Sequence, residues 1–182
     1  MKKNLVIPSL GVFIMFLLVA CIKDTDFEQA NDVALTPTVE LNLIHFDLSA
    51  SDFFDSNTSN PILTVRDTTE LRFLNDTEIQ EGLIRAEFYF KFTNSIARNF
   101  IADFQFLSEE NDTSFTTQTT ITQGTLATPI ITEFTENVEG DAILDLTMAS
   151  KVVVSVTIPS SDATLTGDLN LKSKTTYYTE FQ

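Results

Sequence analysis

The chain has 182 residues, of which 26 are acidic and 11 are basic, and its formal net charge is −15 at pH 7. Such an acidic chain will not bind nucleic acid through phosphate contacts, because those contacts need clustered Lys and Arg side chains. The sequence holds 16 Phe and no Trp, and it is rich in Thr, Val and Ile, residues that favour half-buried strands. The composition therefore predicts a single, mainly β domain.

The first twenty residues have the order of a secretory signal peptide. Lys2 and Lys3 give a positive start, and residues 5–20 carry no charge. At about 1.5 Å per residue this apolar run reaches roughly 24 Å, less than the ~30 Å hydrocarbon core of a bilayer. We therefore predict a helical, cleaved signal peptide over residues 1–20. An uncleaved anchor and ordinary secretion are the alternatives.

The apolar run ends at Leu18-Val19-Ala20-Cys21, and Cys21 is the only cysteine of the chain. This segment resembles the lipobox of bacterial lipoproteins. In that family a peptidase cuts before the cysteine, which then carries lipid on its sulfur and usually on its new amino terminus. The resemblance implies that lipid, palmitate included, on Cys21 anchors the protein in the outer membrane. Two or three acyl chains would anchor it stably, since each buried methylene contributes about 0.8 kcal/mol.

The residues after the cysteine, Lys23-Asp24-Thr25-Asp26-Phe27-Glu28, give a second resemblance. They are similar to the acidic export signal of surface lipoproteins in certain gliding, polysaccharide-degrading outer-membrane bacteria. That resemblance implies display on the extracellular face, although Thr25 interrupts the acidic pair. The alternative is a solvated spacer on a protein of the inner leaflet. We predict that residues 21–38 form a lipidated flexible tether.

The first predicted strand covers residues 39–48. Its apolar residues change parity between Leu43 and Ile44, which predicts a β-bulge. Residues 49–60 are rich in Ser, Asp and Asn and are predicted to form a loop. Residues 61–66 and 69–74 follow as two short strands or one interrupted strand.

The clearest pattern is a pair of runs in which every second residue is apolar. Residues 84–93 place Ile84, Ala86 and three phenylalanines on one parity, and residues 100–107 place three more phenylalanines on one parity. Such runs predict two strands that each turn one face to a core. We predict that they form an antiparallel pair, joined by a hairpin loop over residues 94–99.

The remaining predicted strands lie at residues 115–122, 128–135, 151–158 and 168–181, the first of them at a sheet edge. Residues 142–150 fit a strand or a short helix, and we favour the helix, with Asp141 as its cap. Short strands separated by frequent turns predict an all-β domain over residues 39–182. We expect an antiparallel β-sandwich, immunoglobulin-like in general architecture but without the Cys–Trp–Cys signature of true immunoglobulin domains.

The sequence offers little catalytic chemistry. Cys21 is the predicted lipid site, and the only histidine, His45, lies within a predicted strand with no nucleophile elbow near it, so we expect neither a His-based metal cluster nor a Ser-His-Asp arrangement. We therefore predict that the protein is not an enzyme. The remote alternative is a hydrolase that uses a pair of carboxylates, because glycosidases need only two.

Two loops are rich in the oxygen ligands that calcium prefers. Asp52, Asp55 and Asn57 crowd one loop, and residues 109–112 crowd another. We name Asp52, Asp55 and Asn57 as candidate calcium ligands; turn formation and solubility are the alternative explanation, and no other cofactor is predicted. Binding of a sugar would need an exposed aromatic ring, and Tyr89, Tyr177 and Tyr178 are the candidates. Because Tyr177 and Tyr178 are consecutive on a strand, only one of them can point outward.

These observations predict a non-catalytic binding, adhesion or accessory module held at the membrane by lipid on Cys21. Its partner is an unidentified protein or glycan, and not a nucleic acid. The alternative is a structural or assembly subunit of an outer-membrane complex, which would contact its neighbour through an exposed edge strand.

Overall fold

The computed structural model describes residues 34–181; the predicted signal peptide, Cys21 and most of the predicted tether lie outside this range. Eight long strands form the body: β1 Thr38–Ser49, β4 Thr64–Glu70, β5 Leu83–Asn94, β6 Phe100–Leu107, β7 Thr113–Ile121, β8 Ile130–Glu139, β9 Lys151–Thr157 and β10 Asp168–Thr179. Six short elements connect them: η2 Ala50–Phe53, β2 Phe54–Asp55, β3 Asn60–Pro61, η3 Arg72–Asn75, α2 Thr77–Gly82 and α3 Ala142–Thr147. None of the helices in residues 34–181 is both long and apolar enough to cross a membrane.

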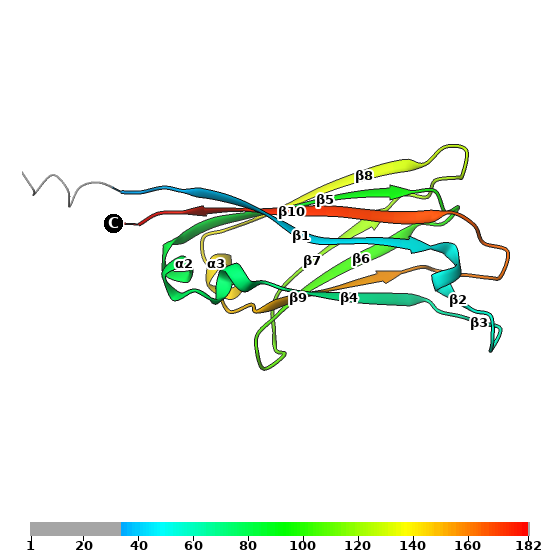
Figure 1. The fold of residues 1–182 in the computed structure, drawn as a ribbon, viewed down its shortest axis with the longest axis horizontal. Coiled ribbons are helices and arrows are strands. Elements are labelled where there is room, and N and C mark those ends of the chain that lie inside the picture. The colour runs from blue at the N-terminus through cyan, green and yellow to red at the C-terminus, as the bar shows by residue number, and fades with distance from the viewer. Residues whose placement is uncertain (1–33, 182) are drawn as a thin grey trace, which may run out of the picture. The chain divides into compact units, whose positions relative to one another are not determined.

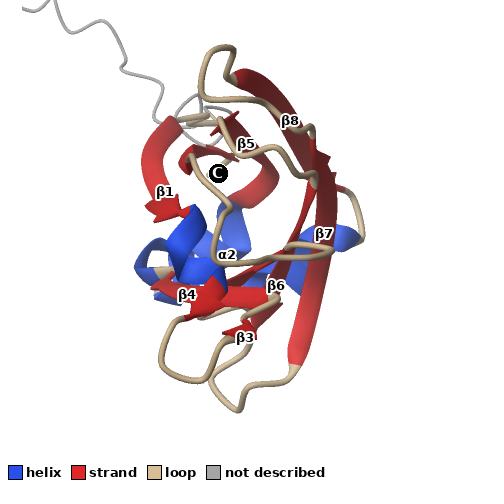
Figure 2. Ribbon diagram, turned by 90° about the vertical axis from the view of Figure 1, so that its right-hand side faces the viewer, coloured by secondary structure: helices blue, strands red, loops and turns tan. Residues whose placement is uncertain are grey.

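The long strands form two four-stranded antiparallel sheets that lie face to face (Figures 1 and 2). The strand orders are β1-β10-β5-β8 and β4-β9-β6-β7. Among the long strands the first pairs with the last, the second with the seventh, the third with the sixth and the fourth with the fifth. A long hairpin folded over on itself produces this pairing, which is that of the jelly roll. The predicted all-β sandwich is confirmed, and its strand order is that of a jelly roll rather than of an immunoglobulin domain.

The two phenylalanine-rich strands lie in opposite sheets. β5 pairs with β10 and β8, whereas β6 pairs with β7 and β9. Their rings meet across the core: the centroids of Phe90 and Phe104 are 4.1 Å apart, and those of Phe88 and Phe106 are 4.9 Å apart. The predicted core is confirmed, but the predicted pairing of these strands is wrong, because alternation identifies the face that a strand buries and not its neighbour in the sheet.

Asn94 holds the corner where the chain leaves one sheet for the other. Its side chain is completely buried and donates to the carbonyl oxygens of Arg98 and Thr122, both at 2.9 Å. Its side-chain oxygen accepts from the backbone N–H of Ile96 at 2.8 Å. Gly124 packs so closely that a Cβ atom there would lie 1.9 Å from the Asn94 carbonyl oxygen. The predicted hairpin loop is therefore a fixed crossover between the sheets.

A bulge interrupts β1 where the sequence predicts it. The pairing with β10 shifts between Asn42 and His45, so Leu43 and Ile44 are both buried. The hydroxyl of Ser173 accepts from the Ile44 N–H at 3.0 Å and donates to the Ile44 carbonyl oxygen at 2.6 Å. The Ser173 side chain thus replaces the ladder hydrogen bonds that the extra residue displaces.

A second bulge explains why one predicted core residue is exposed. The pairing of β5 with β10 shifts next to Leu83, which is buried, whereas Ile84 is 50% exposed. The extra residue reverses the parity at the start of the strand, so the prediction that Ile84 faces the core is wrong.

The segment between the first strand and β5 differs from its prediction. Residues 64–70 form one strand, and η3 and α2 follow it in place of a second strand. Asp76 begins α2, since its carboxylate accepts from the backbone N–H groups of Glu78 and Ile79 at 2.9 and 3.3 Å. The predicted helix α3 is confirmed, but Asp141 makes no side-chain capping hydrogen bond and is itself helical.

The chain enters and leaves the body beside α2 (Figure 1). Leu35 and Phe181 exchange two backbone hydrogen bonds of 2.8 Å, and the Thr179 N–H donates to the Pro37 carbonyl oxygen. The Glu180 N–H donates to the carbonyl of Gly82, the last residue of α2. Within residues 34–181, β-pairing thus begins at Leu35, which falls inside the range 21–38 predicted as a tether.

Candidate functional site

The predicted calcium ligands are engaged in turns. The Asp52 carboxylate accepts from the Ser49 N–H at 2.8 Å. The Asp55 carboxylate accepts from the Asn57 N–H at 2.9 Å and from the Thr58 hydroxyl at 2.7 Å, and these bonds, the one from Thr58 foremost, lower the pKa of Asp55. Within residues 34–181, no three or more His, Asp or Glu side chains form a group that could hold a metal ion. Asp52 and Asp55 thus make the hydrogen bonds that the alternative explanation, turn formation, requires, and calcium binding at this loop stays a prediction.

The predicted sugar-binding rings have different roles. Tyr177 is buried and its ring stacks on Phe73 with centroids 4.7 Å apart, and burial raises the pKa of its hydroxyl well above the usual range. Tyr178 faces outward, with the Arg85 guanidinium carbon 3.8 Å from its ring centroid. The prediction that only one of the two consecutive tyrosines points outward is confirmed.

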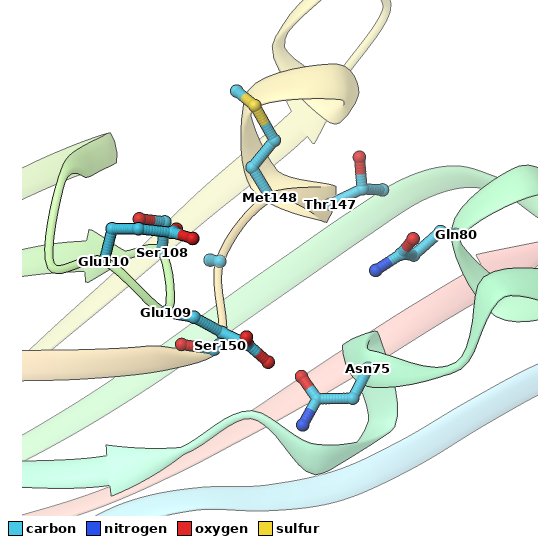
Figure 3. Close-up of a pocket in the computed structure, with 9 residues that line it drawn as sticks. Asn75, Gln80, Ser108, Glu109, Glu110, Thr147, Met148 and Ser150 are labelled. Carbon is cyan, nitrogen blue, oxygen red and sulfur yellow. The ribbon is translucent and has the colours of Figure 1, made fainter.

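A polar cavity of about 430 Å³ lies at the end of the sandwich that carries α2 and α3 (Figures 1 and 3). Four segments build it: η3, α2, the loop after β6, and the end of α3 with the residues that follow it. Its lining residues are Asn75, Gln80, Ser108, Glu109, Glu110, Thr147, Met148, Ala149 and Ser150. We call it the polar pocket. It joins residues that lie up to 75 positions apart in the sequence, from Asn75 to Ser150.

Most polar groups of the polar pocket are held in place by backbone atoms. Gln80 donates to a carbonyl of η3 at 2.6 Å. Thr147 donates to a carbonyl of its own helix at 3.0 Å, and Ser150 donates to the last carbonyl of β6 at 3.3 Å. The Ser108 hydroxyl accepts from a backbone N–H of its own loop at 3.2 Å. These hydrogen bonds fix the orientation of the Ser108, Thr147 and Ser150 hydroxyls at the pocket wall.

The charge of the polar pocket selects against anions. Glu109 and Glu110 are its charged lining residues, and no lysine or arginine of the described chain lines it. Figure 3 shows Glu109 reaching towards Asn75 across the opening. The pocket thus suits a neutral ligand or a cationic one that carries several hydrogen-bonding groups.

The sequence pointed to part of this pocket. Residues 109–112 form an oxygen-rich loop in the sequence, and two of them line the pocket. Asn75, Gln80 and Thr147 carried no signal, because helix α2 was not predicted and single amides and hydroxyls are common on any surface. Only the fold brings them to one place.

No family model matches the sequence, and no curated protein does. Among solved structures, a protein of Parabacteroides distasonis ATCC 8503 that is thought to be secreted is 11% identical with a TM-score of 0.46, over 63% of this chain and 37% of that chain. The VP2 subviral particle of infectious bursal disease virus is 7% identical with a TM-score of 0.42, over 79% of this chain and 32% of that chain. The chain thus spans well under half the length of these structures. The jelly-roll assignment rests on the strand pairings described above.

Proposed function

We propose that this protein is a lipid-anchored outer-membrane protein, displayed on the extracellular face, whose jelly roll is a non-catalytic binding module. The lipobox-like segment supports the anchor, and the acidic residues that follow Cys21 support surface display. Leu35, which pairs with Phe181 at the C-terminal end of the domain, lies fourteen positions after Cys21, so the proposed anchor point is close to the domain in the sequence.

The observation that carries the binding role is the lining of the polar pocket. Its hydroxyls and the Gln80 amide are fixed by backbone hydrogen bonds, and its two carboxylates supply negative charge. Such a lining can hold hydroxyl and ammonium groups of a ligand by hydrogen bonds and charge attraction alone. We therefore propose neutral or amino sugars as the ligand class of the pocket.

The anchor has a direct test. The variant Cys21→Ala removes the sulfur that would carry the lipid, so we expect the protein either in the soluble fraction or at its unprocessed size. Fractionation and intact-mass spectrometry measure both outcomes. Recovery of the variant from membranes at the mature size would contradict the anchor. Protease treatment of intact cells tests display: the wild-type protein should be cleaved while a periplasmic control protein is spared.

The pocket has its own test, by titration of the full-length protein in a nonionic detergent. We expect glucosamine to bind in the polar pocket and glucuronate not to displace it, because the lining carboxylates attract a cation and repel an anion. The double variant Glu109→Gln/Glu110→Gln should weaken glucosamine binding about tenfold, the usual size of a charge-assisted contact. Asp112→Asn, a change in the same loop outside the lining, should leave binding unchanged. Equal affinity of the double variant and the wild type would exclude this role.

The alternative of assembly through an edge strand finds an obstacle on each of the four edge strands. On β4, the Asp67 carboxylate accepts a hydrogen bond of 2.8 Å from the backbone N–H of Thr68. That N–H would otherwise be free to pair with an added strand. Glu136 on β8 occupies an inward parity and accepts from the Thr117 hydroxyl at 2.6 Å. β1 and β7 carry bulges, the second at Ser114. Inward charges and bulges both hinder strand addition, so these edges favour the binding-module proposal.

A further inference from the structure

Two adjacent rows of side chains cross the outer face of the β1-β10-β5-β8 sheet. One row runs Asn42, Lys174, Tyr89 and Thr135, and the next runs His45, Lys172, Lys91 and Glu133. We call these eight residues the cationic band. At about 4.8 Å between strands, the band is roughly 14 Å long.

The charge of the band is opposite to that of the protein. The chain has a net charge of −15, yet these eight positions hold three lysines and one carboxylate, together with the only histidine of the chain. Lys172 lies directly opposite both Lys91 and His45. Like charges in directly opposed positions destabilise a sheet, so this row is not explained by the stability of the fold.

Ion pairs satisfy two of the lysines. Lys91 lies 3.4 Å from Glu133, and Lys174 lies 2.5 Å from Glu40 in the neighbouring row. A hydrogen bond from Tyr89 and then one from Lys91 lower the pKa of Glu133. Lys172 takes part in none of the ion pairs formed within residues 34–181. Among the three lysines of the cationic band, it is therefore the one that remains available to a ligand.

A hollow of about 360 Å³ adjoins Lys172 where β1 bulges. Asn42, His45, Asp47 and Asn170 bring amide, imidazole and carboxylate groups to its lining. The Asn170 amide donates to Asp47 at 2.6 Å, which fixes both side chains. A free ammonium group beside such hydrogen-bonding groups suits a ligand that carries both an anionic group and hydroxyls.

We infer that the cationic band and this hollow bind an anionic polysaccharide, with an acidic group at Lys172 and sugar hydroxyls at the amides. The flanking rows disfavour a denser polyanion, because they place Glu40 and Glu87 on one side and Asp47 on the other. DNA, with one charge per ~1.7 Å of axis, would bring phosphates against these carboxylates. A polysaccharide spaces its charges more widely. None of these residues lines the polar pocket, so the experiment on this surface and the experiment on the polar pocket can fail independently of each other.

Affinity electrophoresis of the full-length protein in a nonionic detergent tests the inference. The gels contain dextran, dextran sulfate or polygalacturonate, so that the first two differ only in their sulfate groups and the last supplies carboxylate. We expect retardation by at least one of the two anionic polymers and not by dextran, with loss of retardation at high salt. Lys172→Ala should weaken the binding about tenfold, and Lys172→Arg should largely retain it.

Lys151→Ala is the matched control, because this lysine lies on β9 in the other sheet and contacts Asn111. It removes the same charge and should leave the retardation unchanged. Melting temperatures of all variants confirm that each is folded. The inference is overturned if neither anionic polymer retards the protein, if dextran retards it equally, or if Lys172→Ala and Lys151→Ala behave alike. A fourth gel contains DNA, and stronger retardation by DNA than by either anionic polysaccharide would also overturn the inference.

Discussion

Replacing Phe90 by alanine will lower the free energy of unfolding by about 3–5 kcal/mol. The Phe90 ring has no solvent exposure, and its centroid lies 4.1 Å from that of Phe104 in the facing sheet and 6.0 Å from that of Phe134 beside it. Its removal loses apolar burial and leaves a void between two sheets that cannot easily close on it. Urea denaturation followed by circular dichroism measures the change.

A matched control separates this effect from a general loss of apolar surface. Ile84 lies on the same strand but is 50% exposed, so Ile84→Ala should cost less than about 1 kcal/mol. Phe104→Ala should resemble Phe90→Ala. The double variant should lose less than the sum of the two, because the ring pair can be broken only once. A loss below about 1 kcal/mol for Phe90→Ala would show that the facing-sheet arrangement is wrong.

The second large effect is expected for Asn94→Asp, which changes the side chain without changing its shape. The amide group donates to two carbonyl oxygens at 2.9 Å in a fully buried corner. A carboxylate would present an oxygen to both carbonyls, leaving them unsatisfied and adding a buried negative charge. We expect a loss of about 3 kcal/mol or more, from the denaturation midpoint at pH 7.

Asn99→Asp is the control for that prediction. Asn99 is exposed, and its side-chain oxygen accepts from the Gln123 N–H at 2.7 Å. Because a carboxylate can also accept this hydrogen bond, the substitution should change stability by less than about 0.5 kcal/mol. If the two Asp variants unfold at the same urea concentration, the hydrogen bonds of Asn94 do not hold the crossover.

The local features of the fold could be predicted because they depend on neighbouring residues. Alternating phenylalanines identify a buried face, and the change of parity in β1 identifies the bulge between Asn42 and His45. The pairing of β5 and β6 could not be predicted in this way. A crossover between sheets and a hairpin loop have similar lengths and polarities, and the difference here depends on three hydrogen bonds of a single buried amide.

The same distinction applies to the sites. The sequence shows which loops are rich in carboxylates. The number of carboxylates in a loop does not show whether their oxygens are available to a ligand or already accept hydrogen bonds from the loop. Asp52 and Asp55 are engaged by backbone groups of their own turns, whereas Glu109 lines a cavity that needs α2 and η3 to exist. The cationic band leaves no pattern in the sequence, because its lysines come from β5 and β10, which are distant in the sequence and adjacent only in the sheet.

The obstacles on the four edge strands matter most for a protein confined to a surface. Copies of a protein anchored as proposed would diffuse in two dimensions with the same end towards the membrane, so their strand edges would meet side by side far more often than in solution. Asp67 and Glu136 would make each such encounter unproductive. Many copies can then be present at high density on the membrane surface without pairing through their strand edges, so the binding face of each copy stays accessible.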